Sequence, residues 1–137
     1  MAPSIRVNCA AAASGGTRRL RILVADDEHD TVFSLTELLR VEGHVGRGVY
    51  SGAAALSAVA EFDPDVVILD LAMPDKSGWE VAREICATYG PSRPVLIAIS
   101  GIYRQGVDCI LGATGGFRYY VSKPYDPNAL LMLLQNL

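Results

Sequence analysis

The sequence predicts an α/β protein built as (βα)5, with five parallel strands in one doubly wound sheet. Two observations support this prediction. Short runs of Val, Ile and Leu alternate with longer segments in which apolar residues recur at helical spacing. Glycine, proline or a helix-capping residue separates most of these segments. Strands and helices that alternate in this way form a parallel sheet with right-handed crossovers and helices on both faces.

The first strand and helix are predicted more strongly than the second strand. Arg21–Ala25 is a compact apolar run, which is typical of a buried strand. A helix is expected over Asp30–Val41, because its apolar residues form one stripe and Gly43 follows its end. His44–Tyr50 is a weaker strand, since the two glycines within it favour a position at the sheet edge.

The middle of the chain contains the clearest strands. Ser51 can cap a helix that is expected to end near Phe62. The apolar run that follows ends at Asp70 and predicts a strand buried on both faces. After a loop with proline and glycine, a helix is expected over Trp79–Tyr89 and a fourth strand over Val95–Ile99.

The last third of the chain predicts a helix, a strand and a final helix. By its position Tyr103–Ala113 should be helical. Its two glycines each cost about 1 kcal/mol relative to alanine, so we expect this helix to be short or mobile. A fifth strand is expected over Phe117–Val121. Asp126 and Pro127 are typical of a helix start, and they precede a helix expected over Asn128–Leu137.

The sequence is expected to form one folded unit after a leader. Residues 1–19 are rich in alanine, serine and glycine and show no periodicity, so we expect a flexible leader there and a domain over 20–137. At 137 residues the chain fits a single domain that can bury a full core. Its three cysteines have no metal-binding spacing and are expected to be reduced thiols.

Charge and hydropathy narrow the functional classes. The net charge of −3 gives no electrostatic footprint for nucleic acid, so we expect none to bind directly. No apolar run approaches the length of about 18 residues that a membrane span needs, and the first residues do not form a signal peptide. We therefore expect no membrane association and a cytoplasmic location.

Chemically reactive side chains follow four of the expected strands at the point where each strand ends. They are Asp26, Asp27, Asp70, Ser100 and Lys123. Parallel strands place their carboxyl ends at one edge of the sheet, where open α/β sheets bind ligands, so we expect these side chains to meet. Three carboxylates, a hydroxyl and an ammonium suit a metal-assisted transfer of a phosphoryl group onto an aspartate.

Each of these residues also has a simpler interpretation. Asp26 and Asp27 repel each other when close, and Mg²⁺ would relieve that repulsion, but Asp27 alone could cap the first helix. Asp70 is either a nucleophile or a strand-end carboxylate bonded to its loop. Ser100 is either a hydrogen-bond partner for a phosphate oxygen or a helix cap. Lys123 is either a partner of Asp70 and of phosphate or a solvated lysine in a turn.

Other polar and aromatic residues are assigned structural roles. His29 and His44 have no partner at metal-binding spacing, so we expect both at the surface. Cys86 is expected to fill space on the inner face of its helix. Tyr119 and Tyr120 are neighbours in the fifth strand, so we expect them to point to opposite faces of the sheet.

Four motifs occur in a fixed order along the chain. They are Asp26-Asp27, Asp70-Leu71-Ala72-Met73-Pro74-Asp75-Lys76-Ser77-Gly78, Ser100-Gly101 and Lys123-Pro124. Together they resemble the receiver domain of bacterial two-component response regulators, over about residues 20–137. The segment 116–124 looks most similar to receivers of hybrid histidine kinases. The resemblance implies a flavodoxin-like fold with strand order 2-1-3-4-5.

The resemblance also implies a role for each matching residue. Asp70 corresponds to the phosphoacceptor, and Ser100 and Lys123 correspond to the residues that bind the phosphoryl group. Tyr120 corresponds to the aromatic switch residue that moves with Ser100, and the Lys123-Pro124 bond is expected to be cis. The implied Mg²⁺ ligands are Asp26, Asp27, Asp70 and the backbone carbonyl of Ala72.

By this resemblance the chain accepts a phosphoryl group from a phosphohistidine. The donor is a sensor histidine kinase or a phosphotransfer protein, and the chain is no enzyme beyond transfer onto its own Asp70 and slow autodephosphorylation. Phosphorylation is expected to change a protein-binding surface that a downstream partner or a fused effector domain reads. A phosphorylation-linked dimer is a further expectation.

Two alternative functions are considered. A module that binds partners without phosphorylation is one of them, because the segment Tyr103–Ala113 is rich in glycine where the receiver family has a firm helix. An aspartate-nucleophile phosphatase of the haloacid-dehalogenase type is the other. It needs a second aspartate two residues after the nucleophile, and Ala72 occupies that position.

Overall fold

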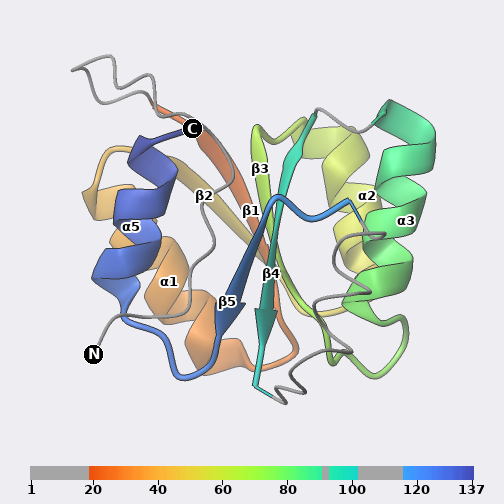
Figure 1. Ribbon diagram of the computed structural model, residues 1–137, viewed down its shortest axis with the longest axis horizontal. Helices are drawn as coiled ribbons and strands as arrows, with labels where there is room; N and C mark the ends of the chain where they lie inside the picture. Colours follow the sequence, from red (N-terminus) through yellow and green to blue (C-terminus); the bar gives the residue numbers. More distant parts are fainter. Residues whose placement is uncertain (1–18, 91–92, 102–115) are drawn as a thin grey trace.

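The computed structural model describes residues 19–90, 93–101 and 116–137. Within these residues, five parallel strands form one sheet in the order β2-β1-β3-β4-β5, which confirms the predicted topology (Figure 1). The strands are β1 (Arg21–Ala25), β2 (Val45–Val49), β3 (Val66–Asp70), β4 (Val95–Ser100) and β5 (Tyr119–Ser122). The helices are α1 (His29–Val41), α2 (Gly52–Phe62), α3 (Gly78–Tyr89) and α5 (Pro127–Gln135). The predicted helix Tyr103–Ala113 and residues 1–18 of the predicted leader lie outside the described residues.

The helices cover the two faces of the sheet in pairs. Helices α1 and α5 lie on one face and α2 and α3 on the other (Figure 1). Successive residues of β1 enter different cores, because side chains of a strand alternate between faces: Ile22 packs toward α1 and α5, and Leu23 packs toward α2 and α3. Every side chain of β3 is buried, so its carboxyl end is held firmly on both sides.

Strand β2 lies at the edge of the sheet, as its two glycines predicted. The structure also shows what surrounds these glycines. A side chain at Gly48 would place its Cβ 2.2 Å from Val32 Cγ1 of α1, and one at Gly46 would contact the Thr36 backbone. Helix α1 therefore packs directly on the backbone of β2. At Gly48 a larger residue would clash with Val32, so this glycine sets how close α1 lies to the sheet, whereas a Cβ at Gly46 would make only ordinary contacts.

Helix ends follow the capping residues, with shifts of one or two positions from the predicted bounds. Helix α1 ends in a Schellman motif: Gly43 has φ of 93°, its N–H donates to Arg40 O, and the next N–H donates to Leu39 O. The Ser51 hydroxyl accepts from Ala54 N–H at the start of α2, as predicted. Asp126 caps α5, and the helix begins at Pro127.

The fifth strand starts later than predicted, at Tyr119, because Phe117 packs against the core beside α3 instead of joining the ladder. Tyr119 is buried on the α1 and α5 face, while Tyr120 lies on the other face near Trp79, so their predicted alternation is confirmed. The Lys123-Pro124 bond is cis, as expected.

The prediction that His44 lies at the surface is wrong. His44 is 6% exposed, and its Nδ1 accepts a hydrogen bond from Leu20 N–H at 3.1 Å. This N–H precedes β1, where the sheet ladder offers it no carbonyl partner, so the imidazole supplies the missing acceptor. His29 is exposed, as predicted. None of the helices in the described part of the chain is long and apolar enough to cross a membrane.

We expect the stability of the fold to fall as His44 becomes protonated. Burial lowers the pKa of His44 below its ordinary value of 6.5, against a smaller opposing effect of Glu42. The unfolded chain therefore binds the proton more readily, and stability is lost as the pH falls below about 6.5. Because the asparagine Oδ1 can replace Nδ1 as acceptor without titrating, the His44→Asn variant should lose less stability over this pH range.

Urea unfolding of both proteins between pH 7.5 and pH 5 tests this prediction. The difference in unfolding free energy between the variant and the wild type should move in favour of the variant as the pH falls. Using this difference removes the contributions of all other titrating groups, which the two proteins share. Parallel curves for the two proteins over the whole range would contradict the role assigned to His44.

Candidate functional site

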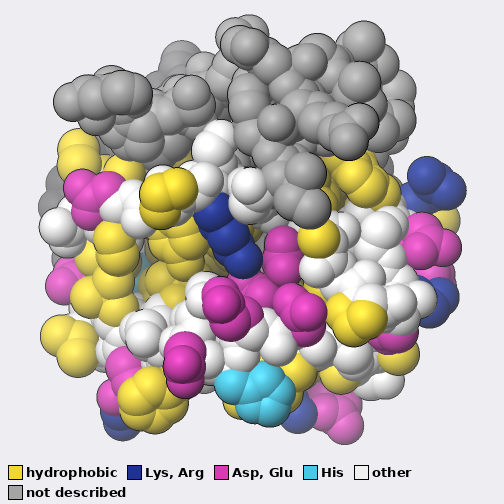
Figure 2. Space-filling view, turned by 90° about the horizontal axis from the view of Figure 1, so that it is seen from below, with side chains coloured by type: hydrophobic (Ala, Val, Ile, Leu, Met, Phe, Trp, Pro, Cys, Tyr) yellow, Lys and Arg dark blue, Asp and Glu magenta, His cyan; other side chains and the backbone are white. Residues whose placement is uncertain are grey.

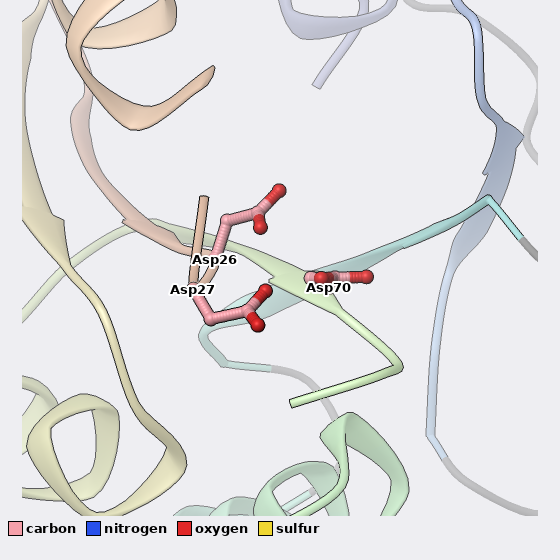
Figure 3. A group of neighbouring side chains, drawn as sticks. All are labelled: Asp26, Asp27 and Asp70. Carbon is pink, nitrogen blue, oxygen red and sulfur yellow. The ribbon is translucent and has the colours of Figure 1, made fainter. Parts of the chain in front are cut away.

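The predicted site residues converge at the carboxyl edge of the sheet. Asp26 and Asp27 follow β1, and Asp70 is the last residue of β3. One carboxylate oxygen from each of these three residues lies within 4.8 Å of one from each of the others (Figure 3). Figure 2 shows this edge of the molecule, where acidic side chains gather beside a basic one. The convergence expected from strand order is therefore present.

Asp26 is the most strongly held of the three carboxylates. It is 2% exposed, its Oδ1 accepts a hydrogen bond from Glu28 N–H at 3.0 Å, and its Oδ2 accepts one from Lys123 Nζ at 2.9 Å. Asp27 is exposed, so its carboxylate faces solvent at the rim of the cluster. One aspartate is thus fixed inside the site, and its neighbour can approach an ion from outside.

Asp70 is buried, but its hydrogen bonds are weaker than those of Asp26. Its side chain accepts one bond from Ala72 N–H at 3.3 Å, and its Oδ2 lies 3.8 Å from Lys123 Nζ. Burial and, after it, the charge of Asp26 raise the pKa of Asp70, while Lys123 and Ala72 lower it, and together these effects raise the pKa from 3.8 to about 6. Lys123 and Ala72 therefore do not fully offset the unfavourable burial and repulsion of the Asp70 negative charge when no metal is bound.

Lys123 forms the expected ion pair with Asp70 and, in addition, a shorter contact with Asp26 that was not predicted. The ammonium hydrogen-bonds Asp26 at 2.9 Å and reaches Asp70 only at ion-pair distance. Burial by itself lowers the pKa of Lys123, but the hydrogen bond to Asp26 and the charges of both aspartates outweigh it, so the pKa is raised and the lysine stays charged. Lys123 thus connects β5 to β1 across the two strands between them.

Ser100 and Tyr120 lie on β4 and β5, the last two strands of the sheet. Ser100 is the final residue of β4, is 5% exposed, and accepts a backbone hydrogen bond from Lys123 N–H at 2.8 Å. Tyr120 pairs with Ala98 in the register of β4 and β5. Its ring centroid lies 5.8 Å from that of Trp79 and 5.9 Å from that of Phe117.

The loop after β3 is held close to Asp70. A side chain at Gly78 would place its Cβ 2.6 Å from the Asp70 carbonyl oxygen, so only glycine allows α3 to begin against the end of β3. The Ser77 hydroxyl and the Glu80 carboxylate then form a capping box at the start of α3. Ala72, the implied source of a carbonyl ligand, lies between Asp70 and this helix start.

Two features near the site were not found by sequence reasoning. The rings of the exposed residues His29 and Tyr50 are stacked, with their centroids 3.9 Å apart. Asp75 bonds two backbone amides at the start of α2, at Gly52 and Ala53. The sequence signals the hydrogen bonds of Asp75 only through the presence of an acidic residue after Pro74, because the partners of Asp75 lie more than twenty residues away.

The donor set suits Mg²⁺. Carboxylate oxygens are hard ligands, and Mg²⁺ prefers one or two of them together with water and phosphate oxygens. Asp26 and Asp70 offer oxygens from buried positions, and exposed Asp27 leaves room for water. The excess negative charge that raises the pKa of Asp70 is also the charge that a divalent cation would neutralise.

Comparisons with known proteins identify the family to which the chain belongs. The family model of the response regulator receiver domain matches residues 22–135. The DNA-binding response regulator MtrA of Mycolicibacterium smegmatis is 39% identical over 115 residues, covering 84% of this chain and 49% of MtrA. Protein PilH of Pseudomonas aeruginosa is 31% identical over 112 residues, covering 81% of this chain and 91% of PilH.

Solved structures show the same fold. The chemotaxis protein CheY4 of Vibrio cholerae has a TM-score of 0.80 at 21% identity, covering 88% of this chain and 100% of that chain. The BeF3-activated DrrB receiver domain has a TM-score of 0.74 at 28% identity, covering 84% of this chain and 93% of that chain. This chain belongs to the response regulator receiver family of two-component systems. It spans about half the length of MtrA.

We expect Asp70→Asn to stabilise the metal-free protein at pH 7.5. The variant removes a buried charge that Asp26 repels, and the raised pKa of about 6 corresponds to a gain of roughly 1–3 kcal/mol. The gain should shrink as the pH falls from about 6 toward 4, because Asp70 of the wild type then becomes neutral in the folded state. Denaturant unfolding in EDTA measures it, and equal stability of the two proteins at pH 7.5 would contradict the unfavourable charge.

Proposed function

We propose that this receiver domain accepts a phosphoryl group on Asp70 from a phosphohistidine, in a Mg²⁺-dependent reaction. The observation that carries the proposal is the position of Asp70. It is a buried carboxylate at the end of β3, close to two further carboxylates and within 3.8 Å of an ammonium. The donor would be a sensor histidine kinase or a phosphotransfer protein.

The chemistry asks little of the protein beyond position and charge. A carboxylate oxygen of Asp70 forms a bond to phosphorus, the phosphorus–nitrogen bond of the phosphohistidine breaks, and the histidine leaves with the electron pair. With a pKa of about 6, Asp70 is ionised at neutral pH and can attack. Mg²⁺, held by Asp26, Asp27, Asp70 and the Ala72 carbonyl, would neutralise charge on the phosphoryl oxygens.

Lys123 and Ser100 would bind the transferred group. The Lys123 ammonium already lies between Asp26 and Asp70, so a phosphoryl group on Asp70 would bring acceptor oxygens toward it. Ser100 ends the neighbouring strand and has a buried hydroxyl-bearing side chain. Slow loss of the group to water would return Asp70 to its starting state, and we assign no reaction on a separate substrate.

Tyr120 would carry the change from the phosphoryl site to the protein surface. It lies on β5, next to the strand that ends in Ser100, and its ring packs with Trp79 and Phe117. When Ser100 moves toward the phosphoryl group, Tyr120 would fill the space left behind. A partner that prefers the resulting surface would shift the population toward it.

Output would pass through a protein partner rather than through direct binding of nucleic acid by this domain. MtrA is named as a DNA-binding response regulator, and this chain covers 49% of it. We propose that a downstream partner or a fused effector domain reads the switched surface, with dimerisation on phosphorylation as one route. Exchange with histidine kinases would place the domain in the cytoplasm.

Incubation with acetyl phosphate and Mg²⁺ should add one phosphoryl group to the wild type. Asp70→Asn should remove the incorporation, because the amide is not a nucleophile, and EDTA should reduce it strongly. Asp63→Asn is the matched control: it makes the same chemical change at the end of α2, where asparagine tolerates the left-handed backbone. Intact-protein mass spectrometry under mild conditions measures the added mass.

Incorporation by Asp70→Asn at the wild-type level would exclude Asp70 as the acceptor. Loss of incorporation in Asp63→Asn would show that the assay reports general damage to the fold. Mg²⁺-independent labelling of the wild type would contradict the role assigned to the carboxylate cluster.

Trp79, the single tryptophan of the chain, should report the switch. Its ring centroid lies 5.8 Å from that of Tyr120, so movement of Tyr120 should change Trp79 emission when beryllofluoride and Mg²⁺ imitate the phosphorylated state. The change should disappear in Asp70→Asn and shrink in Tyr120→Ala. Constant emission of the wild type, with beryllofluoride bound, would instead favour a module that works without phosphorylation.

A further inference from the structure

One carboxylate of the loop between β3 and α3 hydrogen-bonds the start of α2. Asp75 Oδ1 accepts a hydrogen bond from Gly52 N–H at 2.9 Å, and Asp75 Oδ2 accepts one from Ala53 N–H at 2.9 Å. Both amides belong to the first turn of α2, where the helix itself provides no acceptor. Ser51 accepts from the next amide, that of Ala54. The start of α2 thus divides its donors between its own cap and the loop.

A close backbone contact supports this clasp, by which we mean Asp75 with Gly52 and Ala53. A side chain at Gly52 would place its Cβ 2.6 Å from Lys76 Cβ and 3.0 Å from the Lys76 carbonyl oxygen. Glycine at the first position of α2 therefore lets the loop lie directly against the helix. The bonds from Ala53 and Gly52 lower the pKa of Asp75 to about 2, so the clasp is charged across the physiological pH range.

The loop that Asp75 anchors also holds the Asp70 side chain. Ala72 N–H donates to Asp70 Oδ1 at 3.3 Å, a long bond that small movements of the loop would break. The backbone at Leu71 is fixed to β4 by the bond from its N–H to Ile99 O at 2.9 Å. Beyond Ala72 the loop turns toward α2, and Asp75 is the side chain through which it hydrogen-bonds that helix.

We propose that Asp75 is a positioning residue for the Mg²⁺ and phosphoryl site. By fixing the loop on α2, it would hold Ala72 where its N–H orients Asp70 and its carbonyl can serve the ion. This inference rests on the proposed function, since it concerns the same site. Asp75 itself contacts neither the metal nor the phosphoryl group, and its effect passes through Ala72.

Mg²⁺ affinity of the purified chain, measured by isothermal titration calorimetry, tests the proposal. Asp75→Ala should raise the Kd about tenfold, the range seen when residues that support metal ligands are removed. Two matched controls should keep the wild-type Kd within about twofold. Ser51→Ala removes the other cap of the same helix end, and Glu84→Gln breaks the ion pair of the neighbouring loop residue Lys76.

A second measurement distinguishes positioning from simple stabilisation of α2. If the clasp favours Mg²⁺ binding, linkage requires that Mg²⁺ favours the clasp by the same factor. Mg²⁺ should therefore slow hydrogen exchange of the Gly52 and Ala53 amides in the wild type and in Ser51→Ala, and should not do so in Asp75→Ala. Asp75→Asn keeps one acceptor oxygen, so its Mg²⁺ affinity and its exchange protection should lie between those of the wild type and Asp75→Ala. This variant replaces Asp75→Ala in the test if the alanine variant does not fold.

Wild-type Mg²⁺ affinity in Asp75→Ala would overturn the proposal. So would an equal loss of affinity in Ser51→Ala, because the effect would then come from the stability of α2. A wild-type chain that binds no Mg²⁺ would contradict the proposed function and this inference together, whereas a normal wild type with an unaffected Asp75→Ala variant would contradict this inference alone.

Discussion

The ion pair between Asp26 and Lys123 is the interaction on which the site depends. It joins residues that are 97 positions apart in sequence and that directly follow β1 and β5. Because these strands are not neighbours, the lysine side chain crosses the ends of β3 and β4 to reach its partner. One ammonium faces three carboxylates, which leaves the described cluster with a net negative charge of two. That residual charge is equal in magnitude and opposite in sign to the charge of one divalent cation. The suitability of this cluster for a divalent cation therefore follows from a lysine that lies close to Asp26 and farther from Asp70.

This charge arrangement requires a scaffold that does not relax. Carboxylates that repel one another would move apart if the strand ends could separate, but β1 and β3 are buried on both faces and pair along their length. Glycine contacts extend this rigidity to the helices. Gly48 brings α1 onto β2, and Gly78 brings α3 onto the end of β3. The packing thus holds like charges together, and the unfavourable energy is stored where a ligand can relieve it.

Periodicity predicted the strands and the helix layers, the family resemblance implied the strand order, and together they indicated the edge at which Asp26, Asp27, Asp70 and Lys123 meet. These features depend on short-range patterns and on the general geometry of parallel sheets. The errors concern long-range partners. His44 is buried because Leu20 N–H, at the start of the neighbouring strand, needs an acceptor. Lys123 forms the predicted ion pair with Asp70, but its closer contact with Asp26 depends on a difference of about one ångström. No local pattern contains either fact.

The shift in the start of β5 has a similar origin. Phe117 fits a strand by its type, but its ring finds Trp79 and Tyr120 on the side of the sheet that α3 covers. Side-chain packing therefore decides where the ladder begins.

The two oxygens of Asp70 contact different parts of the structure: Oδ1 accepts a hydrogen bond from the loop that leads to α3, and Oδ2 faces Lys123 at the end of β5. In the proposed reaction, the loop that carries Ala72 would position Oδ1 beside the metal site. Lys123, which follows β5, would contact Oδ2, and β5 also carries the proposed switch residue Tyr120. The Asp70 carboxylate would then couple metal binding directly to the switch in β5, without a longer chain of intervening residues.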